Sequence, residues 1–141
     1  EANKIAAIQQ EFVSFCTDVG PAGGSLIAGH PRAFGAFPRL LSRYVRDQGA
    51  ISLERAVAQA SAAGANNVLA LDRGRIAEGL AADIIVLDYL RLTDKATFTQ
   101  PAALSEGMQY VIVNGVLVLD GGRQTDARPG RVLRGPGYRS Q

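Results

Sequence analysis

The sequence predicts an α/β protein, and two observations support this class. The first is the period of the apolar residues, which is helical through residues 38–49 and 52–64. The second is the β-rich character of the C-terminal half, since residues 84–87 read Ile-Ile-Val-Leu and residues 110–122 place Asn-Gly between two β-rich runs. Asn-Gly supplies two residues that tolerate a positive φ, as a tight type I′ hairpin requires. Helices are therefore expected first, followed by strands with a hairpin among them.

The first segment combines a helix with a strand. Residues 2–10 space their apolar residues as a short amphipathic helix does, and residues 11–16 are rich in residues that favour a strand. Asp18 then stands at the carboxyl end of this strand. A helix, a strand and a polar residue at the strand's carboxyl end are the repeating order of a parallel barrel, whose catalytic groups lie at that end. Cys16 would face the same side as Asp18, and we interpret it as a packed interior thiol.

A stretch rich in glycine and proline comes next, at residues 19–31. Such a composition does not sustain regular structure, so we expect a mobile loop that covers a site. Part of the stretch resembles a phosphate-binding loop in its glycines. It lacks the Gly-Lys-Ser or Gly-Lys-Thr ending of that motif, so a nucleotide site is not supported.

Two helices and a shorter third are predicted after this loop. Pro38 suits the first turn of the first helix, because its missing N–H is no loss there, and Gly49 ends that helix. Ser52 is the expected N-cap of the second helix and Gly64 its end. Residues 65–71 would form the short third helix. The positions expected on the buried faces are Leu40, Leu41, Tyr44, Val45, Leu53, Ala56, Val57 and Ala60.

The C-terminal half begins with the strand of residues 84–87, which we expect to be buried and entered by a tight turn. Asp83 and Asp88 bracket it, and their short side chains can bond local backbone. Residues 89–107 have no clean period and are interpreted as a connector to the hairpin. The last six residues are expected to be unstructured.

Composition excludes several classes of protein. The net charge is +2 and the basic residues are scattered among acids, so a nucleic-acid partner is not supported. No apolar run approaches the roughly eighteen residues of a membrane span, and no signal-peptide pattern is present, so the cytoplasm is the expected compartment, with any export signal upstream. A single cysteine excludes an intrachain disulfide and a cysteine zinc cluster. The start at Glu1 fits truncation or processing.

Three stretches carry a resemblance to a known group of enzymes. Residues 74–88 resemble the Gly-x-Ile-x-x-Gly-x-x-Ala-Asp segment of the amidohydrolase superfamily, which continues with three apolar residues and a second aspartate. Residues 30–39, His-Pro-Arg-Ala-Phe-Gly-Ala-Phe-Pro-Arg, resemble the segment after the last barrel strand of the N-acyl-D-amino-acid deacylases, or D-aminoacylases. Residues 129–135 are similar to the tail of that family. The likeness extends over nearly the whole chain.

The resemblance implies a fold and a domain order. Residues 1–71 would supply the last strand and the C-terminal helices of a (β/α)8 barrel. Residues 72–135 would supply the C-terminal strands of a small β-sandwich domain, with residues 136–141 as a disordered tail. A complete barrel needs about 250 residues. We therefore expect this chain to be the C-terminal part of a longer enzyme, whose N-terminal portion is its partner, as a separate chain or as missing sequence.

The resemblance also implies a metal-dependent hydrolase that cleaves the amide bond of N-acyl-D-amino acids or related N-acylated small molecules. In such enzymes the aspartate that ends the last barrel strand takes a proton from a metal-bound water and passes it to the leaving nitrogen, which is the role implied for Asp18. Arg32 could bind the substrate carboxylate with its planar fork of donors, and His30 would line the same pocket. The expected cofactor is zinc, whose three protein ligands must lie upstream of this chain.

Several alternatives stay open. Asp18 could cap loop amides, and Arg32 could pair with a neighbouring acid. Residues 16–19 read Cys-Thr-Asp-Val where the family has Gly-Ser-Asp-Gly, which leaves the substrate open, so another cyclic or linear amide is an alternative. A stand-alone, non-catalytic β-rich binding module is another. A processed N-terminal-nucleophile acylase is excluded, because it needs Ser, Thr or Cys where this chain has Glu1.

Overall fold

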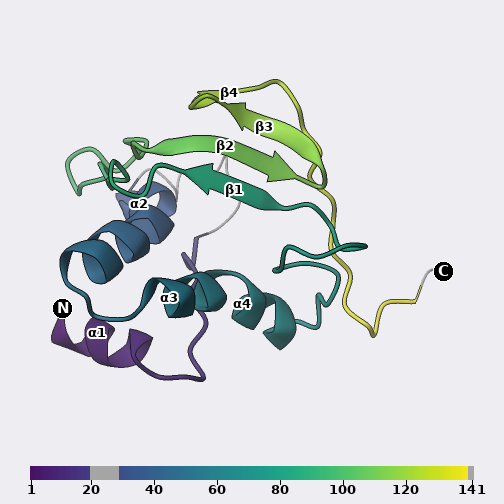
Figure 1. Ribbon diagram of the computed structural model, residues 1–141, viewed down its shortest axis with the longest axis horizontal. Helices are drawn as coiled ribbons and strands as arrows, with labels where there is room; N and C mark the ends of the chain where they lie inside the picture. Colours follow the sequence, from purple (N-terminus) through teal and green to yellow (C-terminus); the bar gives the residue numbers. More distant parts are fainter. Residues whose placement is uncertain (20–28, 140–141) are drawn as a thin grey trace.

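The computed structural model describes residues 1–19 and 29–139, so most of the loop predicted at residues 19–31 lies outside the described residues. The helices lie on one side of a four-stranded antiparallel sheet (Figure 1). The helices are α1 (Ala2–Ile8), α2 (Arg32–Arg39), the π-helix η2 (Leu40–Asp47), α3 (Leu53–Ala60) and α4 (Ala62–Asn67). The strands are β1 (Ile84–Leu87), β2 (Met108–Val113), β3 (Val116–Asp120) and β4 (Arg123–Gln124). Within the described ranges, no helix is long and apolar enough to cross a membrane.

The hairpin predicted around Asn-Gly is confirmed. β2 and β3 pair in antiparallel register, with Val113 opposite Val116. Asn114 and Gly115 between them have φ values of 48° and 79°, as a type I′ turn requires. A second glycine turn leads into β4, which is only two residues long and was not predicted. β1 pairs with β2, so the strand order follows the chain from β1 to β4.

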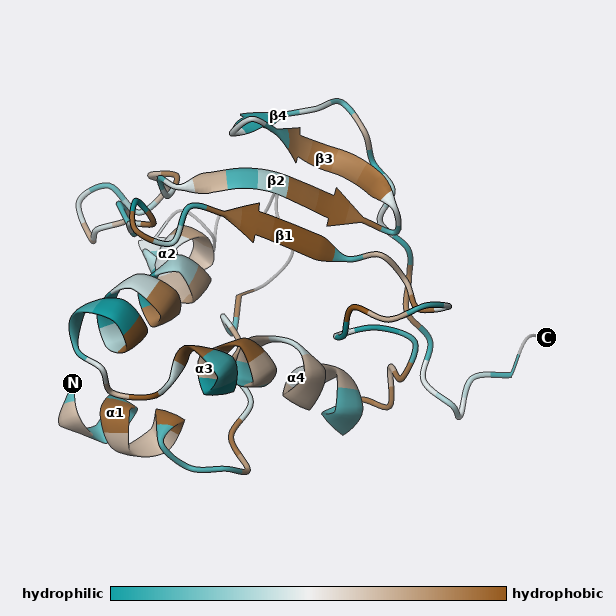
Figure 2. Cartoon of the chain, viewed as in Figure 1, coloured by the Kyte–Doolittle hydropathy of each residue, from teal (hydrophilic) through white to brown (hydrophobic). Residues whose placement is uncertain are grey.

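The strand at residues 84–87 is confirmed as β1, but the prediction that it is buried was wrong. β1 lies at the edge of the sheet and pairs with β2 alone among the described strands. Ile85 and Val86 of this strand are 58% and 46% exposed. In Figure 2, β1 and much of β3 carry the colour of hydrophobic residues. Asp88 accepts hydrogen bonds from the backbone N–H groups of Leu90 and Arg91, as its position after the strand predicted.

The hydrophobic core lies among the helices. Leu40 and Ala56 are fully buried, and Tyr44 and Val45 of η2 are nearly so. The predicted inner face of this helix is therefore confirmed. The face predicted for α3 was wrong in part, because Leu53 and Val57 are exposed while Gln59 is buried. The amide of Gln59 donates to the carbonyl oxygens of Ile8 and Gln10, so a polar side chain joins α3 to the end of α1.

The helix predicted from Pro38 begins six residues earlier, at Arg32, so Pro38 lies inside a continuous helical stretch. Proline cannot donate the helical N–H bond, and its ring clashes with the preceding turn. The helix changes from α to π at Leu40, two residues after Pro38, where such a disturbance is expected. The Ser42 hydroxyl donates to the Pro38 carbonyl at 2.8 Å. Gly49 ends the stretch with a φ of 59°, as predicted.

The next two helices differ from the prediction in their bounds. Ser52 is the N-cap of α3, as predicted, and its side chain accepts from the N–H of Arg55. The helix ends at Ala60 rather than at Gly64, because the backbone leaves helical geometry at Ser61. Gly64 instead lies within α4, so the short helix predicted at residues 65–71 was also displaced. The Ser61 hydroxyl donates to the carbonyl of Val57, a local bond that competes with the helical pattern.

The strand predicted at residues 11–16 was wrong for the described structure, where these residues form a turn and irregular backbone. A strand needs a neighbour for its N–H and C=O groups, and none of the described strands pairs with this segment. The N–H of Phe15 instead donates to the carbonyl of Gln59 at 2.9 Å, and Phe15 packs against the helical core. Cys16 is exposed, so its interpretation as a packed interior thiol was also wrong, because no described residue covers it.

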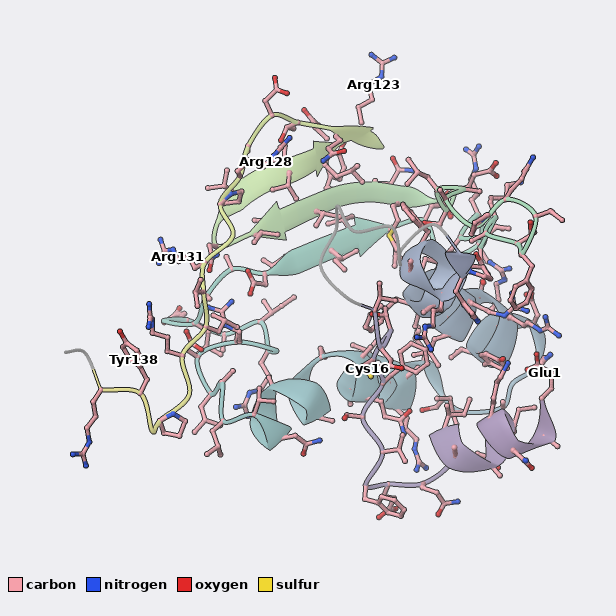
Figure 3. The ribbon with its side chains drawn as sticks, turned by 180° about the vertical axis from the view of Figure 1, so that it is seen from behind. Glu1, Cys16, Arg123, Arg128, Arg131 and Tyr138 are labelled. Carbon is pink, nitrogen blue, oxygen red and sulfur yellow. The ribbon has the colours of Figure 1, made fainter. Side chains whose placement is uncertain are left out.

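The segment after β4 runs along the side of the molecule without further helices or strands among its described residues (Figure 1). Arg128 and Arg131 project from separate points along it (Figure 3). The guanidinium of Arg134 lies 3.9 Å from the ring centre of Tyr138, a cation–π contact within the segment.

Candidate active site

A cavity of about 740 Å³ lies at the edge of the helical layer. Its volume is within the range of sites for small molecules. Four stretches contribute to the lining, together with Tyr44 of η2. They are Glu1 with α1, residues 15–18, α2 with the two residues before it, and residues 94–98 of the connector. All three site residues predicted from the sequence, Asp18, His30 and Arg32, line this cavity. Cys16 lines it as well.

Asp18 and Arg32 form an ion pair in the cavity. Arg32 Nη1 lies 3.3 Å from Asp18 Oδ2, and the side chains are 46% and 84% exposed, respectively. Asp18 has a φ of 50°, a left-handed conformation that aspartate adopts more readily than most residues and that occurs often at functional sites. The pair is open to solvent, so it contributes little to stability and its partners can be exchanged.

His30 contributes to the site through both its ring nitrogen and its ring edge. Its Nδ1 accepts a hydrogen bond from the backbone N–H of Arg32 at 3.1 Å, which satisfies a free donor at the start of α2. Because Nδ1 is an acceptor, the proton of the neutral ring lies on Nε2. The ring also stands edge-to-face against Phe98 of the connector, with the ring centres 5.1 Å apart. His30 therefore joins the start of α2 to the connector.

A second ion pair in the lining was not predicted from the sequence. Arg39 Nη1 lies 3.0 Å from Oδ2 of Asp94, whose side chain is only 7% exposed. The backbone N–H of Ala96 donates to the other oxygen at 2.9 Å. Asp94 lies in a connector without sequence period, 55 residues from its partner, so no local pattern indicated it. Gly35 was the one available signal. Glycine destabilises a helix, so a glycine within one suggests that another group packs closely against it.

Three polar groups of the lining, Tyr44, Glu1 and Arg39, have shifted pKa values. Burial raises the pKa of Tyr44, and so does its hydrogen bond to Glu1. The Tyr44 hydroxyl donates to Glu1 Oε2 at 2.6 Å, and this bond lowers the pKa of the Glu1 carboxyl. Burial by itself would lower the pKa of Arg39. Its hydrogen bond to Asp94 acts in the opposite direction, and the net effect is a raised pKa. At neutral pH the site therefore holds a protonated phenol beside fixed charges of both signs.

A zinc site would need at least three protein ligands close together. Across residues 1–19 and 29–139, no group of three or more His, Cys, Asp or Glu side chains is placed to hold a metal ion. His30 uses Nδ1 for the N–H of Arg32, and Asp18 is paired with Arg32. These residues do not form a zinc site by themselves.

Comparison with known proteins identifies the relatives of this chain. Residues 10–119 match the model of the amidohydrolase family. The chain is 43% identical over 105 residues to an N-acyl-D-glutamate deacylase of Alcaligenes xylosoxydans xylosoxydans, and 40% identical over 104 residues to an N-acyl-D-aspartate deacylase of the same organism. Each match covers 74% of this chain and 21% of the relative. The chain thus spans about a fifth of the length of these relatives.

Solved structures agree with this relationship. A crystal structure of D-aminoacylase superposes with a TM-score of 0.71 at 38% identity, and covers 73% of this chain and 22% of that one. The N-acyl-D-glutamate deacylase of Bordetella bronchiseptica, complexed with zinc and a phosphonate that mimics the tetrahedral intermediate, superposes with a TM-score of 0.69 at 41% identity. That match covers 74% of this chain and 22% of the deacylase. With a family model matched over most of its length, the chain belongs to the amidohydrolase family.

Proposed function

We propose that this chain is the C-terminal part of a metal-dependent hydrolase that cleaves the amide bond of N-acyl-D-amino acids. The observation that carries the proposal is the meeting of Asp18, His30 and Arg32 in one cavity. Hydrolysis of an N-acyl amino acid uses a carboxylate that transfers protons and a cation that binds the substrate carboxylate. Asp18 and Arg32 can supply these two groups. The relatives that act on N-acyl-D-glutamate and N-acyl-D-aspartate support this substrate class.

In the complete enzyme, residues 1–71 would form the last strand and outer helices of a (β/α)8 barrel. Residues 72–135 would belong to a small β-sandwich domain, followed by the tail of residues 136–141. A neighbouring barrel strand would give residues 11–16 the hydrogen-bond partners that the described structure lacks. Asp18 would then stand at the carboxyl end of a barrel strand, where barrel enzymes place their catalytic groups.

Asp18 would act as general base and then as general acid. Water attacks the amide carbonyl carbon and gives a proton to the Asp18 carboxylate, and the same proton passes to the amide nitrogen as the C–N bond breaks. The products are a carboxylic acid and a free amino acid. Exposure of Asp18 in the cavity leaves its oxygens within reach of a bound substrate.

Arg32 and His30 would hold the substrate. The guanidinium of Arg32 can offer two parallel N–H groups to the carboxylate of the amino acid. His30 keeps its Nε2 free of the bond at the start of α2, so this nitrogen can donate to the substrate. We propose zinc as the cofactor, with its protein ligands upstream of this chain. Localisation in the cytoplasm stays a prediction of the sequence.

The test uses the complete enzyme with N-acetyl-D-glutamate, N-acetyl-D-aspartate and their L forms as substrates, and measures release of the free amino acid. We expect hydrolysis of the D forms. Asp18→Asn keeps the shape of the side chain but cannot take up the proton, so turnover should fall by a factor on the order of 100 or more. Asp88→Asn is the matched control, since an asparagine oxygen can still accept from Leu90 and Arg91. Unchanged turnover in Asp18→Asn would contradict the role of Asp18.

A further inference from the structure

One face of α2 takes part in two ion pairs of the cavity. Arg32, Gly35 and Arg39 succeed each other at helical spacings of three and four residues, so they lie along the same side of the helix. Arg32 at the start reaches Asp18, and Arg39 at the end reaches Asp94. The residue that binds the substrate carboxylate in the proposed function therefore shares a helix face with a buried ion pair.

The Asp94 carboxylate fills the space above Gly35. A Cβ built on Gly35 would overlap all three terminal atoms of the Asp94 side chain. Each carboxylate oxygen is also bonded, one by Ala96 N–H and one by Arg39. Asp94 is thus fixed from three directions by steric contact, a backbone bond and a charged bond. Its position and that of α2 cannot change independently.

The connector that carries Asp94 is itself firmly held and forms a wall of the cavity. Arg46 of η2 donates to the carbonyl oxygens of Tyr89, Leu90 and Leu92, at 3.0, 3.3 and 2.6 Å. Residues 96–98, which come shortly after Asp94, line the cavity together with the start of α2. The connector touches α2 itself through the Asp94 carboxylate against Gly35 and Arg39. His30 against Phe98 is a second contact just before the helix, so both contacts set the distance between Arg32 and this wall.

We propose that Asp94 is a positioning residue, which locks the connector onto the face of α2 and thereby sets the place of Arg32 for the substrate carboxylate. The inference rests on the proposed function and adds to it. Asp94 itself touches no reacting atom. It acts through the helix that presents Arg32 and through the wall that ends at Phe98.

The first test is Asp94→Asn in the complete enzyme. Asparagine keeps an oxygen for Ala96 N–H but places an uncharged amide beside Arg39, so the charged bond is lost. We expect KM for an N-acyl-D-amino acid to rise roughly tenfold, as for the loss of one charged hydrogen bond. kcat should stay within about twofold, because uniform binding is affected rather than the chemical step. The amide of the same substrate has no carboxylate for Arg32, and its kinetic constants should hardly change.

The second test uses the steric contact. Alanine normally stabilises a helix relative to glycine, but Gly35→Ala should displace Asp94 and raise KM for the acid substrate. Adding Asp94→Ala removes the overlapping atoms together with the lock, so the KM of the double variant should equal that of Asp94→Ala alone, and the two losses should not add. Gly64→Ala is the matched control, because a Cβ on Gly64 meets no atom within 4 Å and its kinetics should equal those of the wild type.

The outcomes separate the two proposals. No hydrolysis of N-acyl-D-amino acids by the wild-type enzyme would overturn the proposed function, and the role of Asp94 with it. An active wild type with unchanged KM in Asp94→Asn would overturn the role of Asp94 alone. Equal losses for the acid and its amide would also overturn it, because a merely structural residue affects both substrates alike.

Discussion

The ion pair between Asp18 and Arg32 shows how two residues of the site are related before substrate binds. Arg32 Nη1 is 3.3 Å from a carboxylate oxygen of Asp18, and both side chains are exposed to solvent to a large degree. In the proposed function, a substrate carboxylate that reaches Arg32 would compete with Asp18 for the same donors. An exposed pair of this kind is weak, so the exchange costs little. In the proposed function, binding of the substrate would leave the Asp18 carboxylate available for proton transfer.

Arg32→Lys in the complete enzyme tests the recognition of the carboxylate. Lysine keeps the charge but cannot offer two parallel N–H groups. Because a charged hydrogen bond is worth about 1.5 to 3 kcal/mol, kcat/KM for an N-acyl amino acid should fall by roughly one to two orders of magnitude. The amide of the same compound should respond little, and steady-state kinetics on both substrates measure the difference. Arg128→Lys, remote in the C-terminal segment, serves as control. Equal losses on both substrates would assign Arg32 to holding the loop instead.

At the scale of single elements, α3 shows how local sequence chemistry determines a helix start. Ser52 accepts from the N–H of Arg55, and Glu54 lies in the first turn. Hydrogen bonds from its own backbone N–H and from Ser52 lower the pKa of the Glu54 carboxyl. A carboxylate in this position also interacts favourably with the positive end of the helix dipole. Since the folded pKa is lowered, its stabilising effect is present above the ordinary pKa and is lost as the pH falls through the lowered value.

Ser52→Ala tests this capping locally. Loss of an N-cap costs about 1 kcal/mol, so the amide of Arg55 should exchange its hydrogen roughly five times faster where local opening controls exchange. Hydrogen exchange measured by mass spectrometry or NMR on the complete enzyme gives this rate. Ser61→Ala is the control, because the Ser61 hydroxyl donates to the Val57 carbonyl and caps no N–H group. An unchanged rate at Arg55 in Ser52→Ala would contradict the capping role.

Elements whose causes are local could be predicted from the sequence. The Asn114-Gly115 turn, the Ser52 cap and the Gly49 helix end each depend on a few adjacent residues, and the structure confirms all three. The start of α2 could not be predicted in this way, because Pro38 is favourable at a helix start and is tolerated here inside one. Whether β1 is buried depends on which other elements pack against it. The apolar residues of the strand do not determine this by themselves.

The candidate site was predictable where a motif carried it. Asp18, His30 and Arg32 were identified from a strand end and from the His-Pro-Arg segment, and the structure brings them into one cavity. Asp94 was missed because its partners are Gly35 and Arg39, which are far away in sequence and come near only through folding. Long-range contacts of this kind leave no period or spacing in the chain.

At the scale of the whole molecule, the buried residues that the structure describes form a core in the helical layer and none in the sheet. The buried cluster draws on α1, η2 and α3, and none of its fully buried members comes from a strand. β1 presents Ile85 and Val86 to solvent at the edge of the sheet. An exposed apolar edge strand is a template for pairing with another chain. In the proposed enzyme this surface would be covered by the rest of the small β-domain.

The exposed edge of β1 leads to a prediction about the chain by itself. The 141-residue chain expressed alone should be poorly soluble or should form large aggregates, because its apolar edge strand and the exposed helix faces lack their neighbours. Size-exclusion chromatography with light scattering measures the size of any soluble material. Ile85→Lys is the informative variant, since a lysine on an edge strand opposes pairing, and it should increase the soluble fraction. A monomeric wild-type chain with a sharp two-state melt would contradict the prediction and would favour a stand-alone β-rich binding module.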